Sequence, residues 1–336
     1  MCVRAPWSRA APRSPSLLPL LHPADYIHQQ GGGWCESPSD CLGRSKTDLG
    51  SSKFFAKNMS FASGYLSYLP AENPMMYNWT KVYLKYCDGG SQTGDVAAPV
   101  TVGSSTIYYR GHRILRAVQA ALISRGLSSA TDVVISGCSA GGLSTFLHAD
   151  EWAAALPAAR VTAAPDSGFF LDYNSTSGGG YGAALRWVAA AMNAVLPAAC
   201  VAANADDTAR CIFAEHVSAT LKTPTFPLQG EYDSWQLGND ARVNTNNETA
   251  VNEWGAMLTA RVNANLLNQP QHGIFLDSCL HHCGGWDNFQ SPGDKLTQAL
   301  AHQAWYGGSA KRVWAQGAKY PCKECCNGAP ACAGAQ

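Results

Sequence analysis

The fold of this chain is decided by the stretch Val133-Val134-Ile135-Ser136-Gly137-Cys138-Ser139-Ala140-Gly141-Gly142, in which an apolar strand-like run leads directly into G-x-S-x-G. Such a sequence predicts a nucleophile elbow, a sharp strand-to-helix turn that raises a serine hydroxyl above the edge of a sheet. Small residues are needed beside the serine because larger side chains would collide with the neighbouring backbone. Ser139 is therefore the predicted nucleophile. Because G-x-S-x-G also occurs in ordinary glycine turns, the rest of the chain has to support this assignment.

Around this stretch, apolar strand-like runs alternate with alanine-rich helical runs, and no linker, low-complexity block or internal repeat divides the chain after Tyr26. This alternation is typical of an α/β fold. Several predicted strands end in loops that carry polar residues, which is where open α/β sheets place their sites. The predicted strands lie at 82–84, from 133 onward, and at 161–164, 223–229 and 273–276; the predicted helices lie at 113–127 and 143–156.

The charge balance limits the kinds of partner. The 336 residues include 24 basic and 24 acidic side chains, which gives a formal net charge of zero at pH 7. This balance leaves no electrostatic footprint for nucleic acid or for an anionic membrane. No apolar run of the roughly 18 residues that a spanning helix needs follows the N-terminus. We therefore expect a neutral or small partner, no nucleic acid, no membrane, and a monomer.

The sequence contains 13 cysteines, which is high for a reducing compartment and favours disulfides. Local spacing pairs Cys35 with Cys41, Cys200 with Cys211, and Cys279 with Cys283. Four N-x-S/T sequons also favour a secretory route. They lie at Asn58, Asn78, Asn174 and Asn247.

Separate expectations apply to the first 27 residues and to the cysteine-rich end of the chain. Residues 1–27 make a poor signal peptide because the apolar patch at 17–21 is short and contains Pro19. We favour a wrong gene start or a truncation, leave 1–27 unassigned, and expect the folded domain over 28–336. The domain ends in a cysteine-rich tail, Cys322-x2-Cys325-Cys326-x5-Cys332, for which a zinc site is the alternative to disulfides.

A serine nucleophile needs a histidine base and an acid that orients the base. The chain order that accompanies a nucleophile elbow is serine, acid, histidine. Asp233 follows an apolar run after Ser139, and His281 and His282 stand at the end of a later strand. The residues alone leave the choice between these two histidines open.

Other acids and histidines are weaker candidates. Asp166 also follows a strand, but we expect its carboxylate to accept backbone N–H groups in the turn at 166–168, and we expect Asp277 to form a turn. His148 is expected to pack on the helix after Ser139, and His272 and His302 lack a comparable loop setting.

An oxyanion hole requires backbone N–H groups that approach the substrate oxygen closely. Gly31-Gly32-Gly33-Trp34-Cys35 supplies a glycine-rich loop early in the chain, and a Cys35–Cys41 bridge would hold this loop rigid. A triple glycine alone is usually a turn. Together with an elbow, a later aspartate and a later histidine, it supports an oxyanion hole.

Taken together, these segments resemble the pectin acetylesterase family, which also includes the Notum lipid-removing esterases. The resemblance runs from about residue 28 to residue 332. The segments that carry it are 31–35 (GGGWC), 49–52 (LGSS), 73–74 (NP) with 77–79 (YNW), 86–89 (YCDG), 109–111 (YRG), 137–142 (GCSAGG), 166–172 (DSGFFLD) and 278–283 (SCLHHC).

The resemblance implies an α/β-hydrolase-like fold, with a mostly parallel sheet flanked by helices and with disulfide-stapled loops. It also implies a secreted serine esterase of the cell wall or extracellular space that needs no metal or cofactor. Its catalytic residues would be Ser139, Asp233 and His282, so the resemblance selects His282 over His281. Its oxyanion donors would be Gly32 or Gly33, and Ala140.

Two departures from the family lead to further expectations. Nothing in residues 1–27 resembles the family's opening strand pair, so an edge of the sheet is expected to be missing. Plant members carry cysteines where this chain has Ala149 and Ala164, so Cys138 is expected to be an unpaired packing residue.

The resemblance is closer to the plant members, so the expected substrate is an O-acetylated pectin or a related wall polysaccharide. A longer acyl chain, as for Notum, is the second hypothesis, and an inactive carbohydrate-binding homologue is the third. Four aromatic residues are candidates for a sugar-binding floor, although core packing is their commoner role. They are Trp34, Trp79, Tyr86 and Trp235.

Overall fold

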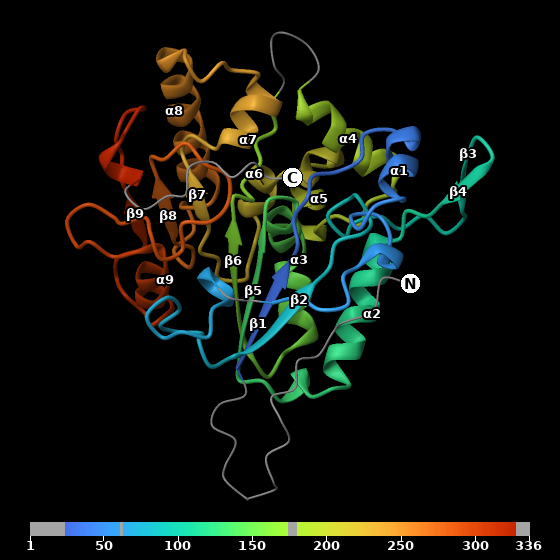
Figure 1. Ribbon diagram of the computed structural model, residues 1–336, viewed down its shortest axis with the longest axis horizontal. Helices are drawn as coiled ribbons and strands as arrows, with labels where there is room; N and C mark the ends of the chain where they lie inside the picture. The colour runs from blue at the N-terminus through green and yellow to red at the C-terminus, as the bar shows by residue number, and fades with distance from the viewer. Residues whose placement is uncertain (1–23, 61–62, 174–179, 327–336) are drawn as a thin grey trace, which may run out of the picture.

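The structure is a computed structural model that describes residues 24–60, 63–173 and 180–326 (Figure 1). Its centre is a seven-stranded sheet in the order β2-β1-β5-β6-β7-β8-β9, in which every neighbouring pair is parallel. The strands of this sheet are β1 (Ala24–Gln29), β2 (Thr80–Leu84), β5 (Asp132–Cys138), β6 (Arg160–Asp166), β7 (Leu228–Gly230), β8 (Ile274–Asp277) and β9 (Val313–Ala315). A separate antiparallel pair is formed by β3 (Val100–Val102) and β4 (Ser105–Ile107). The α/β prediction is confirmed.

Helices surround the sheet (Figure 1). The α-helices are α1 (Pro38–Arg44), α2 (Gly111–Ile123), α3 (Ala140–Ala155), α4 (Tyr181–Ala191), α5 (Ala198–Ala203), α6 (Ala214–Ser218), α7 (Ser234–Gln236), α8 (Glu248–Asn265) and α9 (Gln298–Tyr306). The short 3-10 helices are η1 (Ser52–Phe54), η2 (Gly64–Leu66), η3 (Leu127–Ser129), η4 (Thr208–Ile212) and η6 (Glu324–Cys326), and η5 (Leu237–Ala241) is a π-helix. Among the described residues, no helix is both long and apolar enough to cross a membrane.

The two faces of the sheet are buried by different helices. Val133 and Ile135 of β5 pack in one cluster with apolar residues of α2 and with Trp152 of α3. Val134 between them lies in the cluster on the opposite face, which includes Trp305 of α9. Successive strand residues point to opposite faces, so a continuous apolar run is what a strand covered on both sides requires.

The first strand corrects the expected domain boundary. Residues 24–27, which we left outside the folded domain, lie in β1, and β1 pairs with β2 on one side and β5 on the other. Tyr26 and Ile27 are fully buried on opposite faces of the sheet. The expectation that residues before 28 supply no strand was therefore wrong. Residues 1–23 lie outside the described part of the chain.

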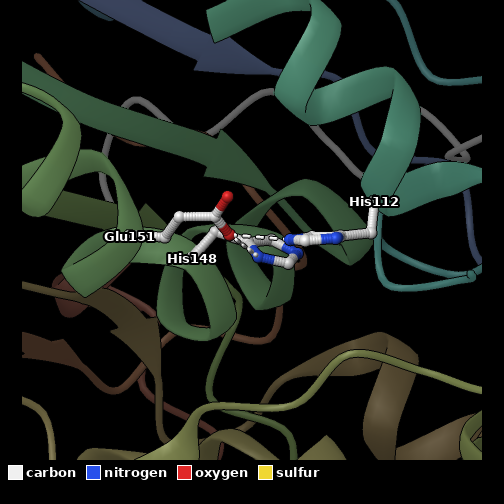
Figure 2. A group of neighbouring side chains, drawn as sticks. All are labelled: His112, His148 and Glu151. Carbon is white, nitrogen blue, oxygen red and sulfur yellow. Dashed lines mark hydrogen bonds and ion pairs between the residues drawn. The ribbon is translucent and has the colours of Figure 1, made fainter.

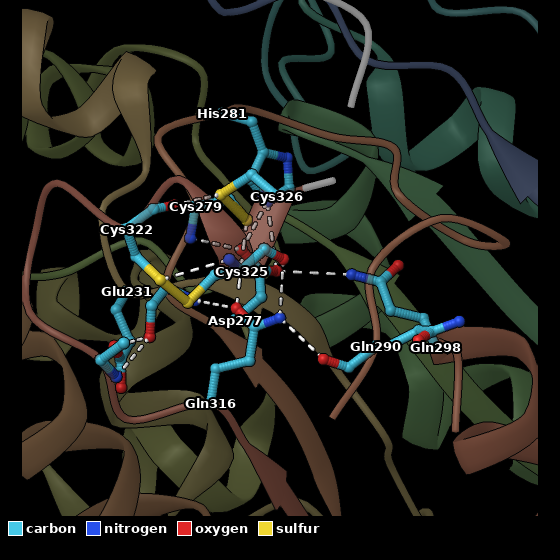
Figure 3. Close-up of a disulfide and its surroundings, with 12 residues drawn as sticks. Glu231, Asp277, Cys279, His281, Gln290, Gln298, Gln316, Cys322, Cys325 and Cys326 are labelled. Carbon is cyan, nitrogen blue, oxygen red and sulfur yellow. Dashed lines mark hydrogen bonds and ion pairs between the residues drawn. A yellow bond between two sulfur atoms is a disulfide. The ribbon is translucent and has the colours of Figure 1, made fainter. Parts of the chain in front are cut away.

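The described cysteines form disulfides, as expected, but not all of the local pairings hold. Cys35–Cys41 and Cys200–Cys211 are confirmed. The predicted Cys279–Cys283 pair is wrong because Cys279 bonds to Cys326, and Cys322 bonds to Cys325 (Figure 3). These bonds use the tail cysteines that the zinc alternative needed, apart from Cys332, which lies outside the described residues.

Candidate active site

Ser139 stands at the junction of β5 and α3 in a backbone conformation that few residues adopt. Its φ and ψ are 59° and −123°, outside the common regions for L-residues. The turn is tight: a Cβ added at Gly141 would lie 2.0 Å from the Gln29 carbonyl oxygen. The Ser139 N–H donates to the Asp166 carbonyl oxygen at 3.0 Å, which fixes the turn to the end of β6. The predicted elbow geometry is present.

Asp233 and His282 are in hydrogen-bond contact, although they come from different loops. Asp233 follows β7 and caps α7, where its Oδ1 accepts the N–H groups of Trp235 and Gln236, each at 3.0 Å. His282 follows β8, and its Nδ1 lies 3.0 Å from Oδ1 and 2.9 Å from Oδ2 of Asp233. A carboxylate only accepts, so this contact places a hydrogen on Nδ1 and leaves the lone pair of a neutral imidazole on Nε2.

Within the described part of the chain, the second ring nitrogen of His282 is unpaired, and the residue lines the same cavity as the predicted nucleophile. His282 Nε2 is buried and has no hydrogen-bond partner among the described residues. A cavity of about 950 Å³ is lined by Ser139, His282, Gly32 and Gly33 together. The structure thus brings these four predicted site residues to one cavity.

The glycine loop has the backbone that close approach requires. Gly32 and Gly33 have φ values of +134° and +63°, and a Cβ added at Gly32 would lie 2.7 Å from a methyl group of Leu49. Ala140, the first residue of α3, is fully buried directly after Ser139. The N–H groups of Gly32, Gly33 and Ala140 donate to no acceptor in the described part of the chain. They are therefore available to a substrate oxygen.

A disulfide joins the turn that carries Ser139 to the loop that carries His282. Cys138, next to Ser139, bonds to Cys283, next to His282, across 145 residues of sequence. The expectation that Cys138 is unpaired was wrong. Its partner could not be inferred from local spacing, because the two cysteines approach only when β5 and the loop after β8 are assembled.

A model of the pectinacetylesterase family matches residues 25–327 of the chain. The chain belongs to this family. Pectin acetylesterase 11 of Arabidopsis thaliana is 33% identical over 80% of this chain and 73% of its own length. Human palmitoleoyl-protein carboxylesterase NOTUM is 28% identical over 81% of this chain and 58% of its own. A crystal structure of the Wnt deacylase Notum from Drosophila superposes with a TM-score of 0.81 at 25% identity and covers 91% of both chains.

The chain has the predicted α/β-hydrolase-like architecture, a mostly parallel sheet flanked by helices with several disulfides. It is a carboxylic-ester hydrolase.

The competing histidine, His281, is placed differently from His282. Its Nε2 lies 3.0 and 3.1 Å from the two carboxylate oxygens of Asp277, and its Nδ1 lies 3.3 Å from the Cys283 carbonyl oxygen (Figure 3). Asp277 is fully buried and also accepts the Cys279 N–H, which is the turn contact that we expected. Burial opposes a charge on the ring, but Asp277 outweighs it and raises the pKa of His281 to about 9.

Asp166, the competing acid, supports the histidine loop without a hydrogen bond to His282. Its Oδ2 accepts the Gly284 N–H at 2.8 Å, and Ser167 Oγ donates to Oδ1. Burial raises its pKa to about 6. We expected this carboxylate to accept backbone N–H groups within its own turn; the N–H group belongs instead to the loop after His282.

The remaining weaker histidines are buried away from this cavity. His272 lies 3.1 Å from the Leu221 carbonyl oxygen, and His302 packs among Phe226, Trp286 and Trp305. His148 is buried on α3, as expected.

An aromatic wall adjoins the cavity, and two of its four rings, those of Tyr181 and Trp235, line the cavity. The wall consists of Trp34, Phe170, Tyr181 and Trp235, whose ring centroids lie 4.6–5.8 Å from their neighbours in the wall. Trp235 also lies 6.0 Å from the ring of His282. Trp34 and Trp235, two of the four aromatic residues considered for a sugar-binding floor, belong to this wall. Tyr86 is buried behind it, and Trp79 packs against Tyr306 elsewhere.

Sequence reasoning missed Ser91, which connects this wall to the elbow. Its Oγ donates to the Ala140 carbonyl oxygen at 2.7 Å and accepts from Trp34 Nε1 at 2.6 Å. Its φ of +50° is unusual for a serine. The segment at 86–91 carried the only available signal, a Cys-Asp-Gly-Gly-Ser loop between predicted elements.

Proposed function

We propose that this pectinacetylesterase family member is a serine esterase that removes O-acetyl groups from pectin or a related cell-wall polysaccharide through an acetyl-enzyme. One observation carries the proposal. His282 is bonded to Asp233 through Nδ1, has an unbonded Nε2, and shares a cavity with Ser139. This is the constellation that converts a weak serine nucleophile into an effective one.

In the proposed reaction, Ser139 Oγ attacks the acetyl carbonyl carbon while His282 Nε2 accepts the hydroxyl proton. The N–H groups of Gly32, Gly33 and Ala140 stabilise the oxyanion, and loss of one such donor typically costs roughly 100-fold to 1000-fold in rate. The C–O bond to the sugar then breaks as His282 returns the proton to the sugar oxygen. Water, deprotonated by His282, releases acetate and restores Ser139.

The aromatic wall supports a short acyl group. Tyr181 and Trp235 line the cavity together with Ser139, and Trp34 and Phe170 pack against Trp235. We take these bulky neighbours to favour an acetyl group over a long hydrocarbon chain. The rest of the cavity lining includes Tyr65, Trp286 and Asn288. Aromatic faces with polar neighbours suit the apolar faces and hydroxyl edges of a sugar.

A secreted glycoprotein is part of the same proposal. The disulfides of the described residues favour an oxidising compartment. Three sequon asparagines have exposed side chains that a glycosyltransferase can reach: Asn58, Asn78 and Asn247. Asn174 lies outside the described residues.

The test of the catalytic assignment is Ser139→Ala, with Ser136→Ala as the matched control. Ser136 lies in β5, shortly before Ser139 in the sequence, and its hydroxyl donates to the Ala164 carbonyl oxygen inside the sheet. We expect release of acetate from acetylated pectin and labelling by a fluorophosphonate probe in the wild type and in Ser136→Ala, and neither in Ser139→Ala. Substantial activity in Ser139→Ala would refute the assignment. An unlabelled wild type would support the inactive carbohydrate-binding homologue instead.

A second candidate function is hydrolysis of longer acyl esters, which the likeness to Notum favours. Aryl acetate and aryl octanoate distinguish the two functions. We expect the acetate to be hydrolysed with a kcat/KM at least tenfold higher than the octanoate. The reverse preference would assign the longer acyl group.

A further inference from the structure

Three side chains from α2 and α3 meet between these two helices (Figure 2). His112 comes from the first turn of α2, and His148 and Glu151 lie one turn apart on α3, with all three pointing toward one another (Figure 2). Glu151 Oε2 is 3.0 Å from His112 Nε2 and 3.5 Å from His148 Nδ1. One potential ligand atom from each residue lies within 4.8 Å of the other two.

The hydrogen bond on the other side of His148 fixes its tautomer. His148 Nε2 lies 3.2 Å from the Ser91 carbonyl oxygen, which only accepts, so Nε2 carries a hydrogen. The neutral ring then has its lone pair on Nδ1, which faces the carboxylate oxygen of Glu151. Two acceptors in this arrangement repel each other unless a proton or a cation lies between them. His148 is only 2% exposed, so bulk water does not screen the repulsion.

Two of the three ligand-atom separations are close to those of a tetrahedral metal site, and all three are within 4.8 Å. Zinc binds imidazole nitrogen and carboxylate oxygen at about 2.0–2.2 Å, so two ligand atoms of a tetrahedral zinc ion are about 3.3–3.5 Å apart. The two measured separations of 3.0 and 3.5 Å bracket this range. A histidine that donates its second N–H to a backbone carbonyl, as His148 does, is the usual support of a metal ligand.

The surroundings leave one coordination position open. Glu151 Oε1 is directed to Arg116, whose Nε lies 3.7 Å away, so Glu151 offers one oxygen to the cluster. His112, His148 and Glu151 line a cavity of about 800 Å³ that also contains Arg116 and Lys222. A water molecule in this cavity can supply the fourth ligand.

We propose that His112, His148 and Glu151 form a binding site for a divalent transition-metal ion, with Zn²⁺ as the best match. Two imidazoles and one carboxylate in a tetrahedral arrangement suit zinc better than calcium or magnesium, which prefer oxygen ligands. The ion clamps α2 to α3. It also holds His148 against Ser91, whose hydroxyl bonds to Ala140 and Trp34 on the catalytic side. The site is a structural support and takes no part in the proposed ester hydrolysis.

The test is calorimetric titration of Zn²⁺ into the full-length chain after removal of any affinity tag and dialysis against a chelator. We expect one Zn²⁺ per chain in the wild type. His112→Ala and Glu151→Gln should weaken binding by more than the roughly 10-fold to 100-fold that loss of a supporting contact costs. Zn²⁺ at about 100 times its Kd should also raise the Tm of the wild type by a few degrees, and of neither variant.

Two controls separate this site from other histidines. His216→Ala removes a histidine that also lies 3.1 Å from a carboxylate, Asp172, but beside Arg186 and Arg210, so it should bind Zn²⁺ as the wild type does. His282→Ala should also retain binding. Co²⁺ should give the intense visible absorption of a tetrahedral complex in the wild type and in both controls.

Several outcomes would overturn the proposal. It fails if the wild type shows no saturable binding at micromolar Zn²⁺, in which case a protonated His148 explains the contact with Glu151. It also fails if His112→Ala and Glu151→Gln bind normally, or if His282→Ala abolishes binding. Circular dichroism of the metal-free variants establishes that each is folded, and His112→Asn replaces His112→Ala if the latter is not.

Discussion

His281 and His282 are neighbours in sequence, and each contacts a buried aspartate, yet their chemistry differs. His282 uses Nδ1 for Asp233 and keeps Nε2 free of described partners. His281 uses Nε2 for Asp277 and Nδ1 for the Cys283 carbonyl oxygen. Both partners of His281 only accept, so both of its nitrogens donate and the ring is an imidazolium. A histidine whose two nitrogens are both engaged as donors cannot accept a proton from a serine.

These contacts support the proposed catalytic role of His282 and indicate a structural role for His281. His281 belongs to a network that includes Asp277, Gln298 and the Cys279–Cys326 disulfide (Figure 3). This network holds the loop that presents His282 to the cavity. His281 acts on the reaction only through the position of that loop.

The largest expected effect is on turnover. His282→Ala should lower kcat on an aryl acetate by roughly 10⁴-fold or more, because the serine loses its base. His281→Gln should lower kcat by less than about tenfold, since Gln keeps one hydrogen-bond donor toward Asp277. Steady-state kinetics at pH 7, with circular dichroism to establish folding, tests the pair. Equal losses in the two variants would refute the division of roles.

The next effect concerns the disulfide that anchors the histidine loop to the elbow. The Cys138–Cys283 bond spans 145 residues and Cys200–Cys211 spans 11. In the chain-entropy model, these bonds stabilise by about 5 and about 3 kcal/mol respectively. Cys138→Ala with Cys283→Ala should therefore lower the free energy of unfolding more than Cys200→Ala with Cys211→Ala.

Only the first of these double variants should also lose activity. Release of Cys283 loosens the spacing between Ser139 and His282, and a displacement of about 1 Å can cost roughly 100-fold in rate. Urea unfolding and kcat, measured on both double variants, provide the two readouts. Retention of full activity without the Cys138–Cys283 bond would show that the network around His281 positions the loop by itself.

The proton on His281 should make a smaller, pH-dependent contribution to the free energy of unfolding. Its pKa is about 9 in the folded protein and about 6.5 in an unfolded chain. The folded state is therefore the better proton acceptor, and the resulting stability is complete below pH 6.5 and is lost as the pH rises through 9. The upper limit of this contribution is about 3 kcal/mol.

Urea unfolding of the wild type and His281→Gln at pH 6, 8 and 9.5 tests this expectation. The wild type should lose stability over this range, and the variant should lose less. If the two pH profiles are parallel, His281 is not charged in the folded protein.

Much of this arrangement was predictable because its signals are local. The elbow depends on small residues beside Ser139, and the Cys35–Cys41 and Cys200–Cys211 bonds join cysteines that are close in sequence. Asp233 and His282 lie at hydrogen-bond distance, as the family resemblance implied, and their catalytic role stays a prediction.

What sequence reasoning could not reach depends on tertiary approach. Cys283 is four residues from Cys279, but its partner is Cys138, which the parallel sheet brings beside the loop after β8. The strand at 24–29 is short and contains polar residues, so its burial between β2 and β5 gave no clear periodic signal. Nor do His281 and His282 differ in type or spacing. Without the family resemblance, only their hydrogen-bond partners separate them.

The smallest effect comes from the aromatic neighbour of each histidine. Trp235 lies 6.0 Å from the ring of His282 and lines the cavity, whereas Phe289 lies 4.6 Å from the ring of His281 and is buried. Trp235→Ala should enlarge the acyl side of the cavity and raise the ratio of octanoate to acetate hydrolysis by roughly 10-fold or more, since even one methylene group in an apolar pocket is worth roughly 10-fold to 200-fold. Phe289→Ala should leave that ratio unchanged and destabilise the fold by about 3–5 kcal/mol, since it removes a buried ring. Kinetics with both aryl esters and urea unfolding on both variants separate the two roles. If Phe289→Ala changes the acyl preference as much as Trp235→Ala does, the loop moves as one unit and the two histidines cannot be treated as independent parts of the site.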